Sequence, residues 1–148
     1  MSHYSDMQPY YHRSFMSQSS SETGLHLHAP AILSLLRIVV GLAFMEHGTQ
    51  KLFGFPAGDH AIAAFSLLWF AGVLEALGGL LIALGLFTRP VAFILSGEMA
   101  FAYFMAHFPR SFFPALNGGD AAILYCFFFL YLVFAGPGPY SVDAAREG

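Results

Sequence analysis

Four long apolar stretches dominate this sequence, and they lie at about 30–51, 62–88, 90–108 and 119–136. Gly, Pro and Asn residues separate them, at Gly54-Phe55-Pro56, at Thr88-Arg89-Pro90 and between Pro109 and Gly119. Roughly 20 residues of α-helix cross a hydrocarbon layer of about 30 Å, because each residue adds about 1.5 Å. Each stretch is therefore long enough to be a membrane helix. The fourth is the shortest.

A soluble four-helix bundle is the alternative to a membrane protein. Its helices would carry polar outer faces, whereas Ile32–Phe44 and Ala121–Ala135 are apolar nearly all the way round. Hydrophobic residues make up 57% of the chain and charged residues 10%, against about 25% charged residues in a soluble domain. The sequence therefore predicts an all-α fold, an integral membrane four-helix bundle in contact with the lipid bilayer.

The domain organisation follows from the same pattern. Residues 1–29 are polar and lack an apolar periodicity that could cover a core, so we expect a disordered N-terminal tail. Residues 30–143 form the predicted membrane domain, and residues 144–148 form a short C-terminal tail. The first apolar run contains Arg37 and Glu46, which is not typical of a secretory signal.

Charge and cysteine content exclude two classes of function. The six Lys and Arg residues are scattered singly and the net charge is −3, so we expect no nucleic-acid partner. Cys126 is the single cysteine and lies in an apolar run, where we expect a small buried hydrophobe. One cysteine allows no internal disulfide and no Cys-x-x-Cys site, so thiol chemistry would need a partner protein.

Four spans place both termini on one side of the membrane. Arg13, Arg89 and Arg146 then lie on the termini side and Lys51 and Arg110 on the other, which favours cytoplasmic termini. The first and third connections share the opposite side, where we expect one polar mouth. Its predicted members are Glu46, His47, Lys51, Asp59, His60, His107, Arg110, Asn117 and Asp120.

Three ionisable residues are predicted deep in the membrane, namely Arg37, Glu75 and Glu98. Charges at such depth usually pair with each other and mark function. Arginine cannot shed its charge, so the sequence predicts a cluster of Arg37 with Glu75 and Glu98. One arginine against two carboxylates leaves one negative charge over, so one glutamate is expected to hold or carry a proton. These three are the candidate catalytic residues, although such a network could also serve only to hold the helices together.

Small residues share the helix faces of these charges. Counting about 100° per residue, the two faces contain Arg37, Gly41, Phe44, Gly48 and Lys51 in the first stretch, and Gly72, Glu75 and Gly79, with Gly78 at the flank, in the second. Glycine lets a neighbouring helix approach closely. We therefore expect both faces to be packed against other helices.

Several motifs follow one another along residues 31–143. They are Arg37-x-x-x-Gly41 with Glu46-His47-Gly48-x-x-Lys51-Leu52-Phe53-Gly54, Gly72-x-x-Glu75-x-x-Gly78-Gly79 with Gly85-Leu86-Phe87-Thr88-Arg89-Pro90, Asn117-Gly118-Gly119-Asp120 before Tyr125, and Gly136-Pro137-Gly138-Pro139-Tyr140-Ser141-Val142-Asp143. In this combination the chain resembles the DoxX family of small membrane proteins. The resemblance implies a four-helix protein of the bacterial inner membrane with cytoplasmic termini. Asp120 stands where the family pattern usually carries Glu.

The resemblance also implies redox work near the quinone pool. Related proteins belong to membrane oxidoreductase systems of sulfur and aromatic metabolism and of oxidative stress, so we expect a membrane component of a quinone- or thiol-linked oxidoreductase with redox partner subunits. The alternative is a small proton-coupled transporter or an assembly scaffold without catalysis of its own. A second copy of the chain is a further candidate partner, because dimerisation could seal a polar interior.

A quinone is the candidate cofactor, and its site needs an apolar slot, aromatic walls and a proton donor at each carbonyl. Aromatic residues for such walls are Phe101, Tyr103, Phe104, Tyr125 and Phe127–Phe129. The candidate substrate-binding residues are His47, Lys51, Tyr103, His107, Asn117, Asp120 and Tyr125. No metal site is expected, because His47 and His107 at helix ends are more typical of hydrogen-bonded interface residues.

Overall fold

The structure, a computed structural model, describes residues 23–57 and 62–147. Every regular element in these two ranges is a helix. The four long helices are α3 (Ala29–Phe53), α4 (Leu67–Leu84), α5 (Thr88–Ala102) and α7 (Asp120–Ala135). The short ones are α2 (Thr23–His26), α6 (Pro114–Asn117) and α8 (Val142–Glu147). Beyond α5 the helix continues as a π-helical turn, η1 (Tyr103–His107), and a 3-10 turn, η2 (Phe108–Arg110).

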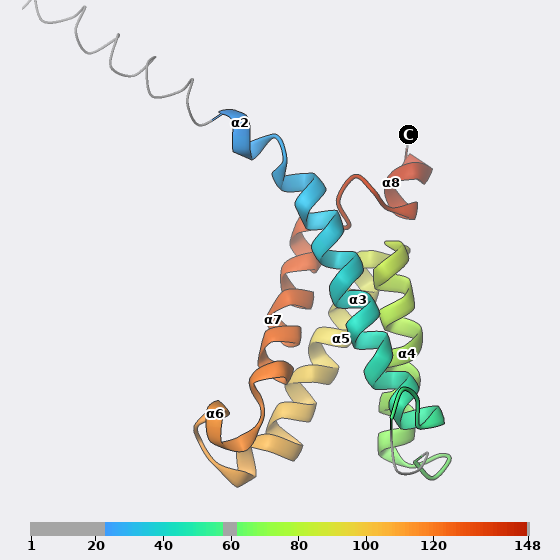
Figure 1. Ribbon diagram of the computed structural model, residues 1–148, viewed down its shortest axis with the longest axis vertical. Helices are drawn as coiled ribbons and strands as arrows, with labels where there is room; N and C mark the ends of the chain where they lie inside the picture. Colours follow the sequence, from blue (N-terminus) through green and yellow to red (C-terminus); the bar gives the residue numbers. More distant parts are fainter. Residues whose placement is uncertain (1–22, 58–61, 148) are drawn as a thin grey trace, which may run out of the picture.

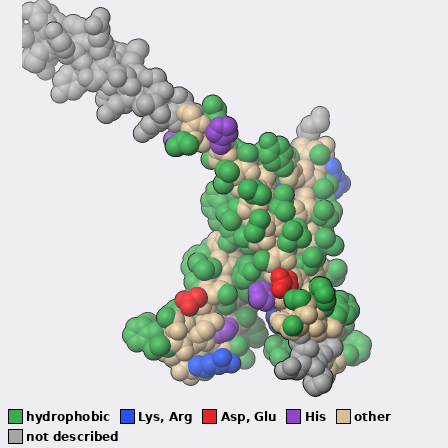
Figure 2. All heavy atoms as spheres, viewed as in Figure 1, with side chains coloured by type: hydrophobic (Ala, Val, Ile, Leu, Met, Phe, Trp, Pro, Cys, Tyr) green, Lys and Arg blue, Asp and Glu red, His purple; other side chains and the backbone are tan. Residues whose placement is uncertain are grey.

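Three helical segments of the described chain are long and apolar enough to cross a membrane: Gly24–Phe53, Leu67–Leu84 and Thr88–Arg110. The fourth, α7, has 16 residues, which span about 24 Å. Hydrophobic side chains cover the outer surface of the bundle (Figure 2), and exposed residues such as Leu42 and Phe93 belong to this surface. The predicted fold class, an all-α membrane bundle, is confirmed.

The long helices pack as two pairs, α3 with α4 and α5 with α7 (Figure 1). The pairs lie close together at the end that carries α2 and α8, which we call the termini end. They diverge toward the other end, which carries α6 and which we call the open end. The described parts next to both termini thus lie at the same end of the bundle, as four crossings require.

Glycines set the close packing of α3 against α4. A Cβ added to Gly41 would lie 2.6 Å from the Ala83 nitrogen, and one added to Gly79 would lie 2.5 Å from the Met45 nitrogen. The buried residues of the two helices are Ser34, Arg37, Gly41, Phe44 and Gly48 in α3, and Gly72, Glu75, Gly78, Gly79 and Ile82 in α4. The two predicted faces are therefore packed, and they face each other.

Two element boundaries differ from the prediction. The second apolar stretch is helical only over Leu67–Leu84, because Ser66 caps its start by accepting a hydrogen bond from the Trp69 N–H, and Gly85 ends it with a φ of +67°. Residues 23–26, predicted in a disordered tail, form α2, and the His28 N–H closes the following turn onto the Leu25 carbonyl. The rest of that predicted tail, residues 1–22, lies outside the described residues.

The α5–α7 pair holds most of the apolar core. Leu95, Phe129 and Leu132 are fully buried, and Phe44 of α3 packs its ring against Phe129. The Ser96 hydroxyl donates to the Cys126 carbonyl at 2.9 Å, and it lies 3.6 Å from the Cys126 sulfur. Cys126 is half-buried, and the Ser96 hydroxyl is a polar group beside its sulfur.

Candidate functional site

Arg37 is fully buried, and its partners are backbone carbonyl oxygens. Its Nη1 donates to the carbonyls of Ile82 and Ala83, the latter at 2.7 Å. Its Nε donates to the Pro137 carbonyl at 2.8 Å and its Nη2 to the Tyr140 carbonyl at 2.6 Å. Carbonyls in the last turn of a helix lack intrahelical partners and carry partial negative charge. The guanidinium therefore caps α4 and ties residues 137–140 to it.

The predicted cluster of Arg37 with Glu75 and Glu98 is wrong. Arg37 contacts Ile82, which lies two turns from Glu75, about 10 Å along α4. The carbonyls at a helix C-terminus supply the negative charge that a buried arginine needs. Arg37 therefore stabilises the termini end and is separate from the two glutamates.

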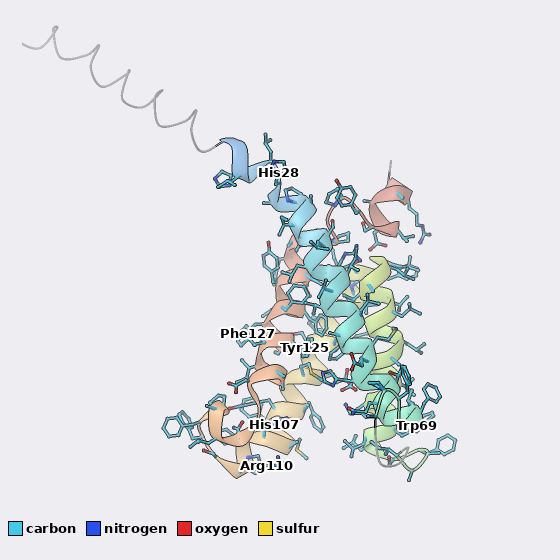
Figure 3. All side chains as sticks on the ribbon, viewed as in Figure 1. His28, Trp69, His107, Arg110, Tyr125 and Phe127 are labelled. Carbon is cyan, nitrogen blue, oxygen red and sulfur yellow. The ribbon has the colours of Figure 1, made fainter. Side chains whose placement is uncertain are left out.

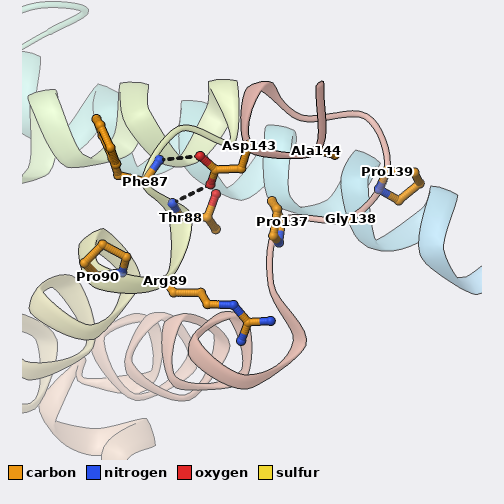
Figure 4. A pocket seen from close by; sticks show the side chains of 9 residues that line it. All are labelled: Phe87, Thr88, Arg89, Pro90, Pro137, Gly138, Pro139, Asp143 and Ala144. Atoms are coloured by element: carbon orange, nitrogen blue, oxygen red, sulfur yellow. Dashed lines mark hydrogen bonds between the residues drawn. The ribbon is translucent and has the colours of Figure 1, made fainter. Parts of the chain in front are cut away.

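Asp143 caps the start of α5 at the same end. It accepts hydrogen bonds from the N–H groups of Phe87, at 2.9 Å, and Thr88, at 2.8 Å (Figure 4). Burial by itself would raise the pKa of Asp143, but these hydrogen bonds and the charge of Arg146 together hold it below the ordinary carboxyl value. The Asp143 N–H also donates to the Gly85 carbonyl at 2.9 Å, so this residue joins the α4–α5 turn to α8.

Arg89 caps the end of α7. Its Nη1 donates to the carbonyls of Val133, at 2.5 Å, and Phe134, at 2.8 Å. The cavity of about 430 Å³ beside it is lined by residues of the α4–α5 turn and of the chain after α7 (Figure 4). Two motifs of the sequence, residues 85–90 and 136–143, thus meet in one junction that closes the termini end.

Glu75 forms an ion pair with Lys51 across the α3–α4 interface. Only 3% of Glu75 is exposed. Its Oε1 accepts from Lys51 Nζ, whereas its Oε2 has no hydrogen-bond partner among the described residues. A Cβ added to Gly72 would lie 3.0 Å from the Lys51 Cβ, so this glycine leaves room for the lysine side chain. Lys51, and not Arg37, neutralises Glu75.

Glu98 faces this ion pair from the other pair of helices. Both of its carboxylate oxygens are buried, and neither has a hydrogen-bond partner in the part of the chain that the structure describes. Glu75 and Lys51 are close enough to Glu98 for their charges to interact with its carboxyl group. We call Lys51, Glu75 and Glu98 the acid–lysine cluster. One cation again stands against two carboxylates, as predicted, but the cation is Lys51.

Tyr125 of α7 lies beside this cluster with His47. The His47 ring meets the Tyr125 ring edge-on, with centroids 5.9 Å apart, and Phe44 packs against Tyr125 at 5.0 Å. Glu46 and Glu75 are close enough to Tyr125 for their charges to interact with its hydroxyl group. Tyr125 points toward α3, whereas Phe127 lies on the outer side of α7 (Figure 3). The surface is hollowed between the two helix pairs at the open end, with acidic and histidine side chains at the rim (Figure 2).

An apolar groove of about 430 Å³ leads to Tyr125 from the lipid-facing surface. Val40 of α3 and four residues of α7, Ala121, Leu124, Tyr125 and Phe128, line it. Leu124 is 71% exposed, so the groove opens toward lipid. Its volume lies in the range of about 300–1,000 Å³ that is typical of ligand sites.

Three of the four remaining predicted binding residues, Tyr103, His107 and Asn117, contact one another. The rings of Tyr103 and His107 stack with centroids 6.4 Å apart, and His107 Nδ1 lies 3.1 Å from the Asn117 carbonyl oxygen. Asn117 is buried and donates to the Ser111 carbonyl at 2.8 Å. Asp120 is exposed in the first turn of α7. These contacts hold the turn between α5 and α7 together.

The predicted aromatic wall is only partly present. Phe101, Phe104 and Phe127 are more than half exposed and face outward, while Phe128 lines the groove and Phe129 belongs to the core. Within residues 23–57 and 62–147, no group of three or more His, Cys, Asp or Glu side chains is arranged to hold a metal ion. The predicted mouth residues Asp59 and His60 lie outside the described residues.

Lys51 is the partner of Glu75 that the sequence did not predict. The sequence does contain a signal for it. Lys51 ends the same helical face as Gly48, and Gly72 precedes Glu75 by one turn on the face that packs against it. Because the two helices are antiparallel, matching Gly48 to Gly72 places Lys51 and Glu75 on opposite sides of that contact, about 9 Å apart along the axes, a distance that two long side chains can bridge.

The fold and these sites define a multi-pass helical membrane protein with a charged cluster in its interior. Comparison with known proteins agrees: the model of the DoxX family matches residues 32–108. An uncharacterized protein of Haemophilus influenzae is 46% identical over 125 residues, which cover 80% of this chain and 93% of that protein. No solved structure matches the chain. The chain belongs to the DoxX family.

Proposed function

We propose that the chain is the membrane component of a quinone- or thiol-linked oxidoreductase system, and that the acid–lysine cluster exchanges protons with a quinone in the groove beside Tyr125. The observation that carries this proposal is the Glu98 carboxylate, which is buried and has no hydrogen-bond partner among the described residues. The family resemblance supports the bacterial inner membrane as the chain's location, and cytoplasmic termini are favoured because Arg13, Arg89 and Arg146 on the termini side outnumber Lys51 and Arg110 on the other.

Charge balance supports a proton on the cluster. A buried carboxylate without a partner is unfavourable by several kcal/mol in a low dielectric. Lys51 neutralises Glu75, so one proton on Glu98 makes the cluster neutral. A proton that is held between two carboxylates and one amine can be passed on when a neighbouring group needs it. This is the property that a proton donor to a membrane substrate requires.

The groove supports the choice of a quinone. It is apolar and opens toward lipid, where a quinone with an isoprenoid tail is dissolved, and Tyr125 is the lining residue that carries a polar group. A bound quinone takes up two electrons and two protons to become a quinol. In this proposal a partner redox subunit supplies the electrons, while Tyr125 and the acid–lysine cluster hold and deliver the protons. Any thiol step would use the partner's thiols, because Cys126 is the single cysteine.

Binding of ubiquinone-1 to the full chain in nanodiscs, followed by calorimetry, tests this proposal. Leu124→Trp fills the groove, and a steric penalty of about 1–3 kcal/mol corresponds to a loss of affinity of about 5-fold to about 140-fold. Phe127→Trp is the matched control, because it lies on the same helix but faces outward, and it should bind like the wild type. Absence of saturable binding to the wild type would overturn the proposal.

One observation favours the alternative, a small proton-coupled transporter. The two helix pairs are closed at the termini end and apart at the open end (Figure 1), which is the shape of one state of an alternating pathway. Proteoliposomes with an imposed pH gradient separate the two functions. Solute uptake that depends on Glu98 and occurs without quinone binding would establish the transporter, whereas quinone binding without uptake supports the oxidoreductase component.

A further inference from the structure

The helices α5 and α7 differ in length although they are paired. They are level at the termini end, where Arg89 reaches the last turn of α7. From there Thr88–Arg110 runs for 23 residues, about 34 Å, whereas the 16 residues of α7 span about 24 Å. The chain after Arg110 must therefore return by about 10 Å before α7 begins. Figure 1 shows α6 on this returning segment.

Contacts confirm how far the segment returns. A Cβ added to Gly119 would lie 2.7 Å from Cε2 of Tyr103, and the Asn117 carbonyl lies 3.1 Å from His107 Nδ1. Residues 117–119 are thus level with η1. They lie nearer to the termini end than Arg110, where the continuous run of α5, η1 and η2 ends. A hydrocarbon layer of about 30 Å, measured from Arg89, ends about 20 residues further along this helix, near Phe108. The turn at Asn117 lies within that layer.

The polar groups around Asn117, at the inner end of the returning segment, are paired inside the protein. The side chain of Asn117, 2% exposed, donates to the Ser111 carbonyl at 2.8 Å and accepts from the Gly119 N–H at 2.7 Å. The Gly118 N–H donates to the Pro114 carbonyl at 3.0 Å. Irregular backbone at membrane depth occurs only where its polar groups have such partners. The backbone around Asn117 meets that condition.

The outward surface of the same segment is apolar. The exposed fractions of Phe112, Phe113 and Leu116 are 73%, 62% and 76%. The ring of Phe112 contacts those of Phe108 and Phe113, with centroids 6.3 and 5.5 Å apart, and Phe108 contacts Phe104 of the π-helical turn at 5.8 Å. These aromatic residues extend the lipid-facing surface of α5 without a break. Aromatic side chains are enriched at membrane interfaces.

We propose that residues 111–119 form a re-entrant turn that lies in the lipid at the open end, with Phe112, Phe113 and Leu116 in contact with the bilayer and the exposed Arg110 at its edge. The partner of this surface is lipid, because the surface continues that of a membrane-spanning helix. Asn117 and Asp120 then lie below the membrane surface. Glu98, about 15 Å along the helix from Thr88, lies near the middle of the membrane. This inference does not depend on the proposed function.

Nitroxide labels on the full chain in liposomes test the turn, in a Cys126→Ser background. Phe113→Cys and Leu116→Cys carry the label, Phe93→Cys on α5 is the lipid reference, and Ala145→Cys in α8 is the water reference. We expect the labels at 113 and 116 to collide readily with oxygen, as at 93, and several-fold less often than at 145 with a water-soluble nickel complex.

Two results would overturn the re-entrant turn. Nickel collisions at 113 and 116 that equal those at 145 would place the segment in water. Low collision rates with both oxygen and nickel would show that protein covers the surface, a second copy or a partner subunit. Gel filtration of each variant checks folding, and Ala115→Cys, a smaller change at an exposed position of the same turn, replaces any variant that does not fold.

Discussion

Replacing Arg37 by methionine should destabilise the protein strongly, although no carboxylate is stranded by the change. Methionine fills much of the volume but leaves four carbonyl oxygens, those of Ile82, Ala83, Pro137 and Tyr140, without their shared donor. Hydrogen bonds to a charged group contribute about 1.5–3 kcal/mol each. The four are not additive, because they share one group and the junction can relax.

We therefore expect Arg37→Met to lower the free energy of unfolding by about 3–5 kcal/mol, which corresponds to about two such hydrogen bonds. Arg89→Met is the matched control, since the exposed Arg89 bonds to two carbonyls only and should cost about 1 kcal/mol. Unfolding in mixed micelles with increasing dodecyl sulfate measures both. Equal losses for the two variants would refute the assignment of Arg37 as the residue that closes the termini end.

Other predictions concern packing, pH and the ion pair, each measured in the same unfolding assay. Gly79→Ala should lower the free energy of unfolding by about 1–3 kcal/mol, because its Cβ would lie 2.5 Å from a backbone nitrogen of α3. Gly97→Ala is the control and should lower it by nothing, because a Cβ there meets open space among the described residues. Equal effects would contradict the close packing. The pKa of Asp143 is lowered from 3.8. Its contribution to the free energy of unfolding is therefore present above that value and is lost as the pH falls through the lower folded-state pKa. The difference in stability between wild type and Asp143→Asn should shrink only in acid, and a constant difference would contradict the capping role. Lys51→Met and Glu75→Gln should each destabilise and should couple by about 1–3 kcal/mol in a double-mutant cycle, whereas additive effects would contradict the pair.

The sequence was sufficient to predict the helices and their packed faces. Four apolar stretches gave four helices, and the spacing of Gly41 and Gly48 identified the face of α3 that α4 covers. Boundaries were predicted less well, because caps such as Ser66 and Gly85 lie inside an apolar stretch. Local chemistry of this kind ends a helix without any change in average hydrophobicity.

The partners of the charges could not be predicted in the same way. Depth in a membrane depends on the register between helices, and Gly41 lies opposite Gly79 and Ala83, which puts Arg37 level with the end of α4 and away from Glu75. Backbone carbonyls as partners of an arginine leave no trace in residue types. The ratio of one cation to two carboxylates was predicted, but with Arg37 where the structure has Lys51; the proton on a glutamate stays a prediction.

In the proposed function, the acid–lysine cluster holds one proton on a carboxyl group inside the membrane. Infrared difference spectra of the full chain in liposomes at neutral pH measure this directly through the C=O stretch of a protonated carboxylic acid. We predict a band that stays unchanged when the buffer outside the liposomes is exchanged. Glu98→Gln should lack this band, and Asp120→Asn should keep it. A spectrum in which the wild type lacks that band, or in which Glu98→Gln keeps it, would contradict the account.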